Sequence, residues 1–446
     1  MLSDILWIFT IGICALLGLR SPYLALYTVI FIDILKPQNL SYGFLANASL
    51  SLLLTSILAF SILINIKKLV LPKKIGITIL LIFFVFWITY TTSIAQFPGP
   101  AWFKYDYVIK TIAMTIVIPF IINTRLKMEI VVCAMVVGVS YYVVIGGVRT
   151  ALGQGGYGMP LVPTRLGDSE IVETSTLSMI AVFTIPLLIY IRNHSLFRNK
   201  IRFLKHICIF LIACCLLTIL GTYARTGLIG LFILFFLFFL SSRHKLKIAV
   251  GSVVAAACIL VFVSDDYLSR MQTLENATED SSALGRILVW KWTIDYVKDR
   301  PITGGGFDSF RANTGQLNQY LPNSTNIEIK ETTPKAFHNV FFEVLGEQGY
   351  IGLLVYMLLI YRSWYLNWKL SRDENCESSL RNLATVLHQI IIIYCVCGMF
   401  IGVAYAPWIF YFIGISSALQ NVTAASSEAP SSSRGRKSLS RTKPPK

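Results

Sequence analysis

The sequence predicts an all-α protein that crosses a lipid bilayer many times. Hydrophobic residues make up 55% of its 446 residues and charged residues only 14%, and the mean hydropathy is +0.65. This composition is too apolar for a soluble globular protein. The apolar residues also form blocks of about 15 to 22, the length that lets a helix cross a hydrocarbon core of about 30 Å. A membrane β-barrel would show alternating polarity instead, so we predict a helical bundle.

Thirteen apolar blocks are candidate spans, and several are short, so we expect 12 or 13 spans. The blocks cover residues 5–19, 22–35, 44–65, 75–94, 108–122, 129–148, 174–191, 207–222, 227–241, 247–264, 339–361, 383–403 and 406–421.

The chain accordingly divides into two groups of spans on either side of one large extramembrane segment, which we expect to be partly helical. The predicted regions are N-terminal helices (1–222), the helices preceding the segment (223–264), the segment itself (265–338), C-terminal helices (339–422) and a tail (423–446). The tail is rich in Ser, Pro, Arg and Lys, and we expect it to be disordered.

The distribution of charge predicts the orientation. The 39 Lys and Arg exceed the 23 acidic residues by 16. If the polar segments between successive spans alternate across the membrane, one side holds 25 basic and 5 acidic residues, and the other holds 14 basic and 18 acidic residues. The positive-inside rule makes the first side cytoplasmic, and the C-terminal tail belongs to it. The basic excess therefore reflects topology and an anionic leaflet, and we predict no nucleic-acid partner.

Three outer segments contain candidate functional residues, and the first two are short. Residues 149–173 form a Gly- and Pro-rich loop with Arg165 near its centre; no GK[ST] follows, so Walker-type nucleotide binding is disfavoured. Residues 221–227 form a short turn that places Tyr223 and Arg225 at the membrane boundary. Such an arginine either snorkels to water or meets an anion, and the sequence leaves both roles open.

The third outer segment begins with a predicted amphipathic helix at 281–299. Arg286 and Trp290 are four residues apart and share a face, where the ring can stack on or shield the guanidinium. Arg300-Pro301 ends the helix, and Gly304–Gly306 makes a turn in which we expect exposed backbone N–H groups.

His338 lies at the outer edge of the next span and is the only one of the five histidines on the outer side. A histidine at a helix start is often a cap, so a structural role stays open beside a catalytic one. No second His or Cys lies outside, which argues against a zinc site. Glu343 and Glu347 share a helix face and suggest a proton relay, a cation site or water-facing side chains.

Together these motifs resemble the shared domain of bacterial O-antigen ligases and O-antigen polymerases. The resemblance rests on Arg286, Trp292, Pro301, Gly304-x-Gly306, His338-Asn339 and Leu345-Gly346-Glu347-x-Gly349-x-x-Gly352-Leu353, with TYARTG at 222–227. The whole chain, including residues 19–44, is most similar to the exosortase-associated O-glycosylation ligases.

This resemblance implies a metal-independent, inverting transfer of a glycan from an undecaprenyl-diphosphate carrier to a hydroxyl acceptor, with no cofactor. The site would face the periplasm from a multi-pass protein of the bacterial inner membrane. Arg225 and Arg286 match the arginines that hold the donor diphosphate, and His338 matches the histidine that activates the acceptor. Arg165, Tyr223 and Trp290 are further substrate-binding candidates.

Several alternatives stay open at this point. A polymerase of the same superfamily would use the same residues. A lipid-linked glycan transporter or flippase would place its polar residues near mid-membrane, whereas here they lie at the outer edge. A non-catalytic scaffold would need neither His338 nor the arginines. The sequence identifies neither the glycan nor the acceptor, which is a lipid, a glycan or a protein.

Overall fold

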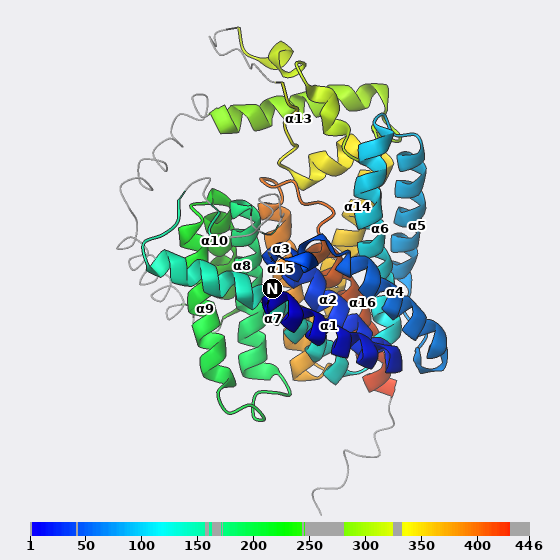
Figure 1. Ribbon diagram of the computed structural model, residues 1–446, viewed down its shortest axis with the longest axis vertical. Coiled ribbons are helices and arrows are strands. Elements are labelled where there is room, and N and C mark those ends of the chain that lie inside the picture. The colour runs from blue at the N-terminus through cyan, green and yellow to red at the C-terminus, as the bar shows by residue number, and fades with distance from the viewer. Residues whose placement is uncertain are drawn as a thin grey trace, which may run out of the picture.

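A computed structural model of the protein describes residues 2–41, 43–156, 160–162, 171, 173–242, 245, 281–323 and 332–428. Every regular element in these residues is a helix (Figure 1). Six of the helices are long and apolar enough to cross a membrane. The prediction of an all-α polytopic membrane protein is therefore confirmed, while the span expected at 247–264 lies outside the described residues.

The helices largely follow the predicted blocks. In chain order they are α1 (Leu2–Arg20), α2 (Pro22–Leu35), α3 (Pro37–Leu40), η1 (Phe44–Asn47), α4 (Leu50–Ile64), η2 (Ile66–Lys68), α5 (Gly76–Ser93), α6 (Pro98–Ile121), α7 (Arg125–Ala151), α8 (Thr174–His194), α9 (Leu204–Gly221), α10 (Arg225–Ser241), α13 (Ser281–Asp299), η3 (Ser309–Asn313), η4 (Leu317–Tyr320), α14 (Val340–Ser371), α15 (Ser378–Cys397) and α16 (Pro407–Glu428).

Several ends differ from the sequence prediction. Helix α6 begins at Pro98, ten residues before the expected span, because a proline is well placed in the first helical turn. Helix α15 ends at Cys397, so residues 398–403 belong to a loop where we expected the end of a membrane span. Helix α16 continues to Glu428, six residues into the expected tail, and residues 429–446 lie outside the described part of the chain.

Small residues let the membrane helices approach closely. A Cβ atom on Gly147 of α7 would lie 2.8 Å from the Cα of Cys214 in α9, and one on Gly146 would lie 2.8 Å from the Thr218 hydroxyl. Helices in lipid gain no hydrophobic driving force from one another, so close packing of this kind is what joins them.

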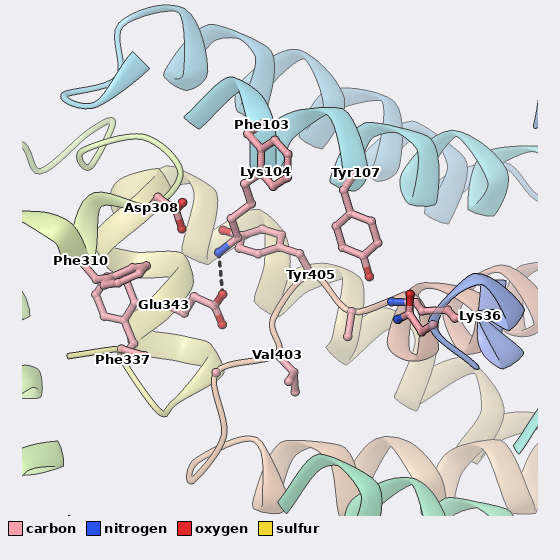
Figure 2. Close-up of a pocket in the computed structure, with 14 residues that line it drawn as sticks. Lys36, Phe103, Lys104, Tyr107, Asp308, Phe310, Phe337, Glu343, Val403 and Tyr405 are labelled. Carbon is pink, nitrogen blue, oxygen red and sulfur yellow. Dashed lines mark hydrogen bonds and ion pairs between the residues drawn. The ribbon is translucent and has the colours of Figure 1, made fainter. Parts of the chain in front are cut away.

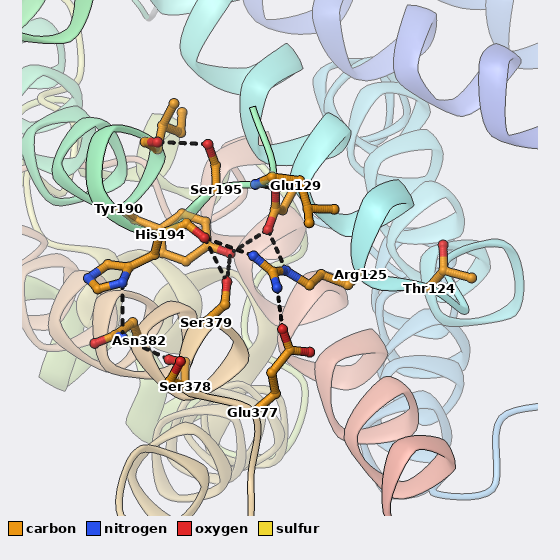
Figure 3. Close-up of polar contacts among 12 residues, drawn as sticks. Thr124, Arg125, Glu129, Tyr190, His194, Ser195, Glu377, Ser378, Ser379 and Asn382 are labelled. Atoms are coloured by element: carbon orange, nitrogen blue, oxygen red, sulfur yellow. Dashed lines mark hydrogen bonds and ion pairs between the residues drawn. The ribbon is translucent and has the colours of Figure 1, made fainter. Parts of the chain in front are cut away.

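Segments that the charge analysis assigns to the cytoplasmic side contact one another at one end of the helices. Lys68 Nζ donates to the carbonyl of Arg20 at 3.1 Å, and the Lys74 amide donates to Asn421 Oδ1 at 2.9 Å. At the same end Arg125 pairs with Glu377 (Figure 3).

Helix α13 lies across the opposite end of the bundle and matches the predicted residues 281–299 (Figure 1). Its inner face forms a small separate core in which Leu288, Val289 and Trp292 pack with Leu317 and Phe337. This segment covers the start of α14 and therefore positions the residues discussed next.

Candidate functional site

The glycine turn after α13 is anchored to α14. At Gly349 the backbone of α14 leaves helical geometry (φ 67°, ψ −170°), and the Tyr350 amide donates to Pro301 O rather than to its own helix. The carbonyl of Gly346 then accepts from Gly305 N at 2.9 Å. We expected the N–H groups of this turn to be exposed, and that prediction is wrong. Gly306 N donates to Glu347 O at 3.0 Å and Gly304 N to Arg300 O at 2.9 Å, so all three glycine amides have acceptors, two of them carbonyls freed by the break in α14.

His338 immediately precedes α14 and has left-handed backbone geometry (φ 48°). The next residue, Asn339, caps the helix by accepting from the amides of Phe341 and Phe342, and its Nδ2 donates to the carbonyl of Met399 at 3.2 Å. The backbone beside His338 is thereby tied both to α14 and to the loop after α15. His338 itself is not the cap.

Trp290 of α13 holds the other side of this backbone. Its Nε1 donates to the carbonyl of Phe337 at 2.9 Å, and its ring stacks on Phe342 with 5.4 Å between centroids. We expected this ring to shield Arg286; the contacts that the structure shows for it are with the residues around His338. They give Trp290 a role in positioning His338.

Charged groups around His338 change its pKa. Its side chain reaches solvent, but the surrounding protein removes part of its hydration, and this burial lowers the pKa. Arg286 lowers it further and Lys335 adds a smaller effect in the same direction, whereas Glu173 and Glu343 oppose them. The structure thus places Arg286 near enough to His338 to act on it, and the lowered pKa favours the neutral imidazole near pH 7.

Lys335 is a cation that the sequence reasoning did not select. A Cβ atom on Gly285 would lie 3.1 Å from Lys335 Nζ, so this amine lies against the backbone next to Arg286. Only the fold places the loop before His338 against α13, which is why no local pattern indicated Lys335.

Arg225 is the first residue of α10 and follows a tight turn in which Tyr223 has a φ of 52°. The adjacent Thr226 carbonyl accepts from the Cys397 thiol at 3.6 Å, and Gly398 in turn accepts from Val340 N at 2.8 Å. The start of α10 therefore lies at the same end of the bundle as the start of α14. Helix N-termini favour anions, which suits the role that we expected for Arg225. Arg165 lies outside the described residues.

A cavity of about 510 Å³ lies next to the start of α14 (Figure 2). Gly402 belongs to its lining, and a Cβ atom on Gly402 would lie 3.5 Å from the backbone amide nitrogen of His338. Its lining residues come from the α2–α3 junction, α6, the turn after Gly306, the start of α14 and the loop after α15: Lys36, Asn39, Phe103, Lys104, Tyr107, Asp308, Phe310, Ala336, Phe337, Glu343, Gly402, Val403, Tyr405 and Ala406.

Lys104 of α6 forms the charged wall of this cavity. Its Nζ lies 2.8 Å from Glu343 Oε1 and 2.9 Å from Glu347 Oε1, and it faces the Tyr405 ring at 4.9 Å. The other Glu343 oxygen accepts from Ala404 N at 3.0 Å. Both glutamates are therefore engaged in an ion pair with Lys104 of the protein itself, a role that the sequence did not indicate.

Lys104 was missed because its partners are 239 and 243 residues away in sequence. Lys36, the second lysine of the cavity, was missed as well. It ends α2 with a φ of 45°, and its Nζ lies 5.5 Å from the centroid of the Tyr107 ring. A helix that ends in left-handed geometry normally has glycine at that position. The lysine found there instead was the one signal for Lys36, and only the fold made it visible.

The fold and the site together define a polytopic helical membrane protein with a polar cavity and a neutral histidine at one end of its helices. Residues 209–357 match the O-antigen ligase family, and residues 2–196 match a family of unknown function (DUF5935). No curated protein matches the sequence. The match at residues 209–357 supports the O-antigen ligase superfamily, as the motifs between Arg225 and Leu353 predicted.

Proposed function

We propose that this protein is a metal-independent, inverting glycosyltransferase of the O-antigen ligase type. Its superfamily supports glycosyl transfer at a membrane. The finer proposal is transfer from an undecaprenyl-diphosphate carrier to a hydroxyl acceptor at the periplasmic face of the bacterial inner membrane, with a cytoplasmic C-terminus. The observation that carries it is the position of His338 at the end of the bundle where α10 and α14 begin, with Arg286 near enough to lower its pKa.

In the proposed reaction His338 accepts the proton of the acceptor hydroxyl. The hydroxyl oxygen forms a bond to the anomeric carbon of the donor, and the bond from that carbon to the diphosphate oxygen breaks, leaving its electron pair on the diphosphate. General-base help of this kind typically contributes about 10²–10⁴-fold. Arg286 supports the role because it lowers the pKa of His338 and so keeps the ring neutral.

Arg225 and Arg286 are proposed to bind the leaving diphosphate. Guanidinium groups keep their charge and can hold phosphate oxygens through two parallel hydrogen bonds. Charge that builds up on the leaving group is stabilised by such preorganised donors. Arg165 and Tyr223 stay candidates for the same region, and Trp290 is proposed to act by positioning His338.

Reconstituted transfer tests this proposal. Full-length protein in nanodiscs should transfer glycan from an undecaprenyl-diphosphate donor, and His338→Ala should abolish transfer while leaving donor binding intact. His206→Ala, which changes an exposed histidine at the start of α9, is the matched control and should keep full activity. Full activity of His338→Ala would remove the general-base role.

Chelation tests metal independence. Activity of the wild-type protein should be unchanged after treatment with a chelator. Loss of activity that one divalent ion specifically restores would contradict the proposal.

A polymerase of the same superfamily, or a lipid-linked glycan transporter, is the alternative function. Mass spectrometry of envelope glycoconjugates with and without the gene separates them, because a ligase links finished glycan to a new acceptor whereas a polymerase extends the glycan. Movement of intact lipid-linked glycan across the bilayer without any new glycosidic bond would indicate transport. The same spectra would show whether the acceptor is that expected of the exosortase-associated subgroup.

A further inference from the structure

A second pocket lies at the end of the bundle opposite α13, where Lys68 contacts the carbonyl of Arg20. Its volume is about 210 Å³, far more than the about 10–15 Å³ that a single buried water molecule needs. Four segments meet around it: the start of α2, the turn after α4, the end of α6 and the start of α7. The lining residues are Pro22, Tyr23, Lys68, Leu69, Ile121 and Lys127.

The charge of this pocket is positive. Lys68 and Lys127 belong to its lining, and none of the described residues that line it is acidic. Residues 34–105 contain no Asp or Glu, and Glu129, the acid nearest to Lys127 in sequence, pairs with Arg125 instead. Two ammonium groups that share a pocket repel each other, so an anion between them would offset an unfavourable arrangement.

Lys127 is held in place by contacts from three helices or their ends. Its Nζ donates to Asn123 Oδ1 at 2.8 Å and to the carbonyl of Ile121 at 3.3 Å, and it lies 5.2 Å from the centroid of the Tyr23 ring. Its own carbonyl accepts from the Tyr27 hydroxyl at 3.1 Å. An ammonium group has three donors, so the two hydrogen bonds leave one donor for a ligand.

Two helices begin at the pocket, and helix N-termini favour negative charge. Pro22 and Tyr23 open α2, and Lys127 lies in the first turn of α7. No side chain caps α2: the buried hydroxyl of Ser21 has no hydrogen-bond partner among the described residues. The carbonyl of Ile121 at the end of α6 would repel an anion, but it already accepts from Lys127.

Apolar side chains beside the pocket are exposed on the outside of the bundle. Leu63, Ile64 and Ile66 lie just before Lys68 and are 70%, 60% and 61% exposed, and Leu126 at the start of α7 is 46% exposed. Exposed apolar residues of this kind mark a surface that contacts a membrane. Lysine side chains at helix ends extend along such a surface to the level of the lipid headgroups.

We propose that this pocket binds the phosphodiester headgroup of an anionic membrane lipid. The phosphate lies between Lys68 and Lys127, and the acyl chains lie along the apolar end of α4. Basic pockets between membrane helices are suited to anionic headgroups. The site is independent of the proposed transfer reaction, because it lies at the other end of the helices and shares no residue with it. In the orientation proposed above, the lipid comes from the cytoplasmic leaflet.

Lipid titration of the purified full-length protein in detergent tests this site. Dioleoylphosphatidylglycerol is compared with dioleoylphosphatidylcholine, whose headgroup has no net charge, and native mass spectrometry measures the affinity of each. The wild-type protein should bind the anionic lipid more tightly. Lys68→Gln and Lys127→Gln should each weaken that binding about fivefold, the loss expected for one lysine near an anionic lipid. Binding of the uncharged lipid should not change.

Lys205→Gln is the matched control, because it makes the same change of charge at an exposed lysine in the first turn of α9. It should keep the wild-type affinity. Lys68→Arg and Lys127→Arg keep the charge and should retain binding, which separates loss of the ligand from loss of the fold. Unchanged affinity in both glutamine variants would overturn the proposal, and so would an equal loss in Lys205→Gln or equal binding of the two lipids by the wild-type protein.

A soluble anion is the other possible source of a phosphate. Inorganic phosphate and glycerol phosphate are therefore added as competitors during the titration. The lipid should stay bound when each competitor is present at a concentration equal to that of the lipid, because neither competitor has acyl chains to place along α4. Displacement of the lipid under these conditions would show that the pocket is a site for a soluble phosphate.

Discussion

Two clusters at opposite ends of the helices each hold a cation between two carboxylates, at least one of which comes from a distant part of the chain. At the outer end Lys104 pairs with Glu343 and Glu347, whose side chains are 8% and 0% exposed. At the inner end Arg125 pairs with Glu129, 1% exposed, and with Glu377, 45% exposed (Figure 3).

The clusters differ in what surrounds the cation. Around Arg125 the remaining polar atoms bond to one another: Tyr190 donates to Glu129 at 3.1 Å, the Leu196 amide donates to it at 2.6 Å, and the carbonyl of His194 accepts from Arg125 at 2.8 Å. Around Lys104 lie aromatic rings and a cavity of about 510 Å³.

A buried ion pair is therefore not by itself a sign of a functional site in this protein. The inner cluster joins α7, α8 and the loop before α15 and has a structural role. The outer cluster is a functional candidate because a ligand can reach it and because residues with strained backbone adjoin it. The predictions below test whether this difference holds.

The largest expected effect is on catalysis at the outer end. His338→Ala should reduce kcat by about 10²–10⁴-fold, because it removes the proposed general base. Transfer rates measured at saturating donor and acceptor test this. A reduction of equal size in the His206→Ala control would show that the effect is not specific to the site.

At the inner end the expected effect is on stability. Arg125→Met should lower the free energy of unfolding by about 3–5 kcal/mol, because it leaves the buried Glu129 without its cation. Transfer per folded molecule should stay unchanged. Thermal unfolding in detergent and activity per folded molecule measure the two quantities, with the exposed Arg198→Met as control. Loss of specific activity in Arg125→Met would break the distinction between the clusters.

The break in α14 offers a smaller test at the outer end. A Cβ atom on Gly349 (φ 67°) would lie 2.3 Å from the Ile302 carbonyl oxygen, whereas one on Gly153 (φ 75°) would meet nothing within 4 Å. Both alanine variants lose about 1–2 kcal/mol to left-handed geometry. Only Gly349→Ala adds a clash, so thermal unfolding should show the larger loss there. Equal losses would mean that the glycine turn can move away from α14.

The smallest expected effect is a change in pH dependence. The proposed transfer requires neutral His338. Because burial and Arg286 lower the pKa of His338, kcat/KM should begin to fall with decreasing pH only below pH 6.5. Arg286→Gln removes a cation that favours the neutral ring, so the pKa of His338 should rise and the fall in rate at low pH should begin at a higher pH. Profiles of kcat/KM against pH measure this. A fall that begins at the same pH in both proteins would show that Arg286 does not act on His338.

Much of the organisation was predictable because its signals are local. Hydropathy predicted the membrane helices, and helical periodicity predicted α13 at residues 281–299. The distribution of Lys and Arg assigned to one side of the membrane several segments that contact one another in the fold. The order of motifs from Arg225 to Leu353 placed the chain in its superfamily. The break in α15 after Cys397 was not predictable, because residues 398–403 are as apolar as a membrane helix.

By itself the sequence determined that this protein is a helical membrane protein with an O-antigen ligase domain, and it selected His338, Arg225 and Arg286. Only the tertiary structure decided what surrounds His338. Lys36 and Lys104 reach the cavity from helices more than two hundred residues away from α14, and Trp290 turned out to contact the backbone beside His338. Periodicity and composition act over one helix, whereas the charge balance of a cavity depends on side chains that meet only when the helices pack.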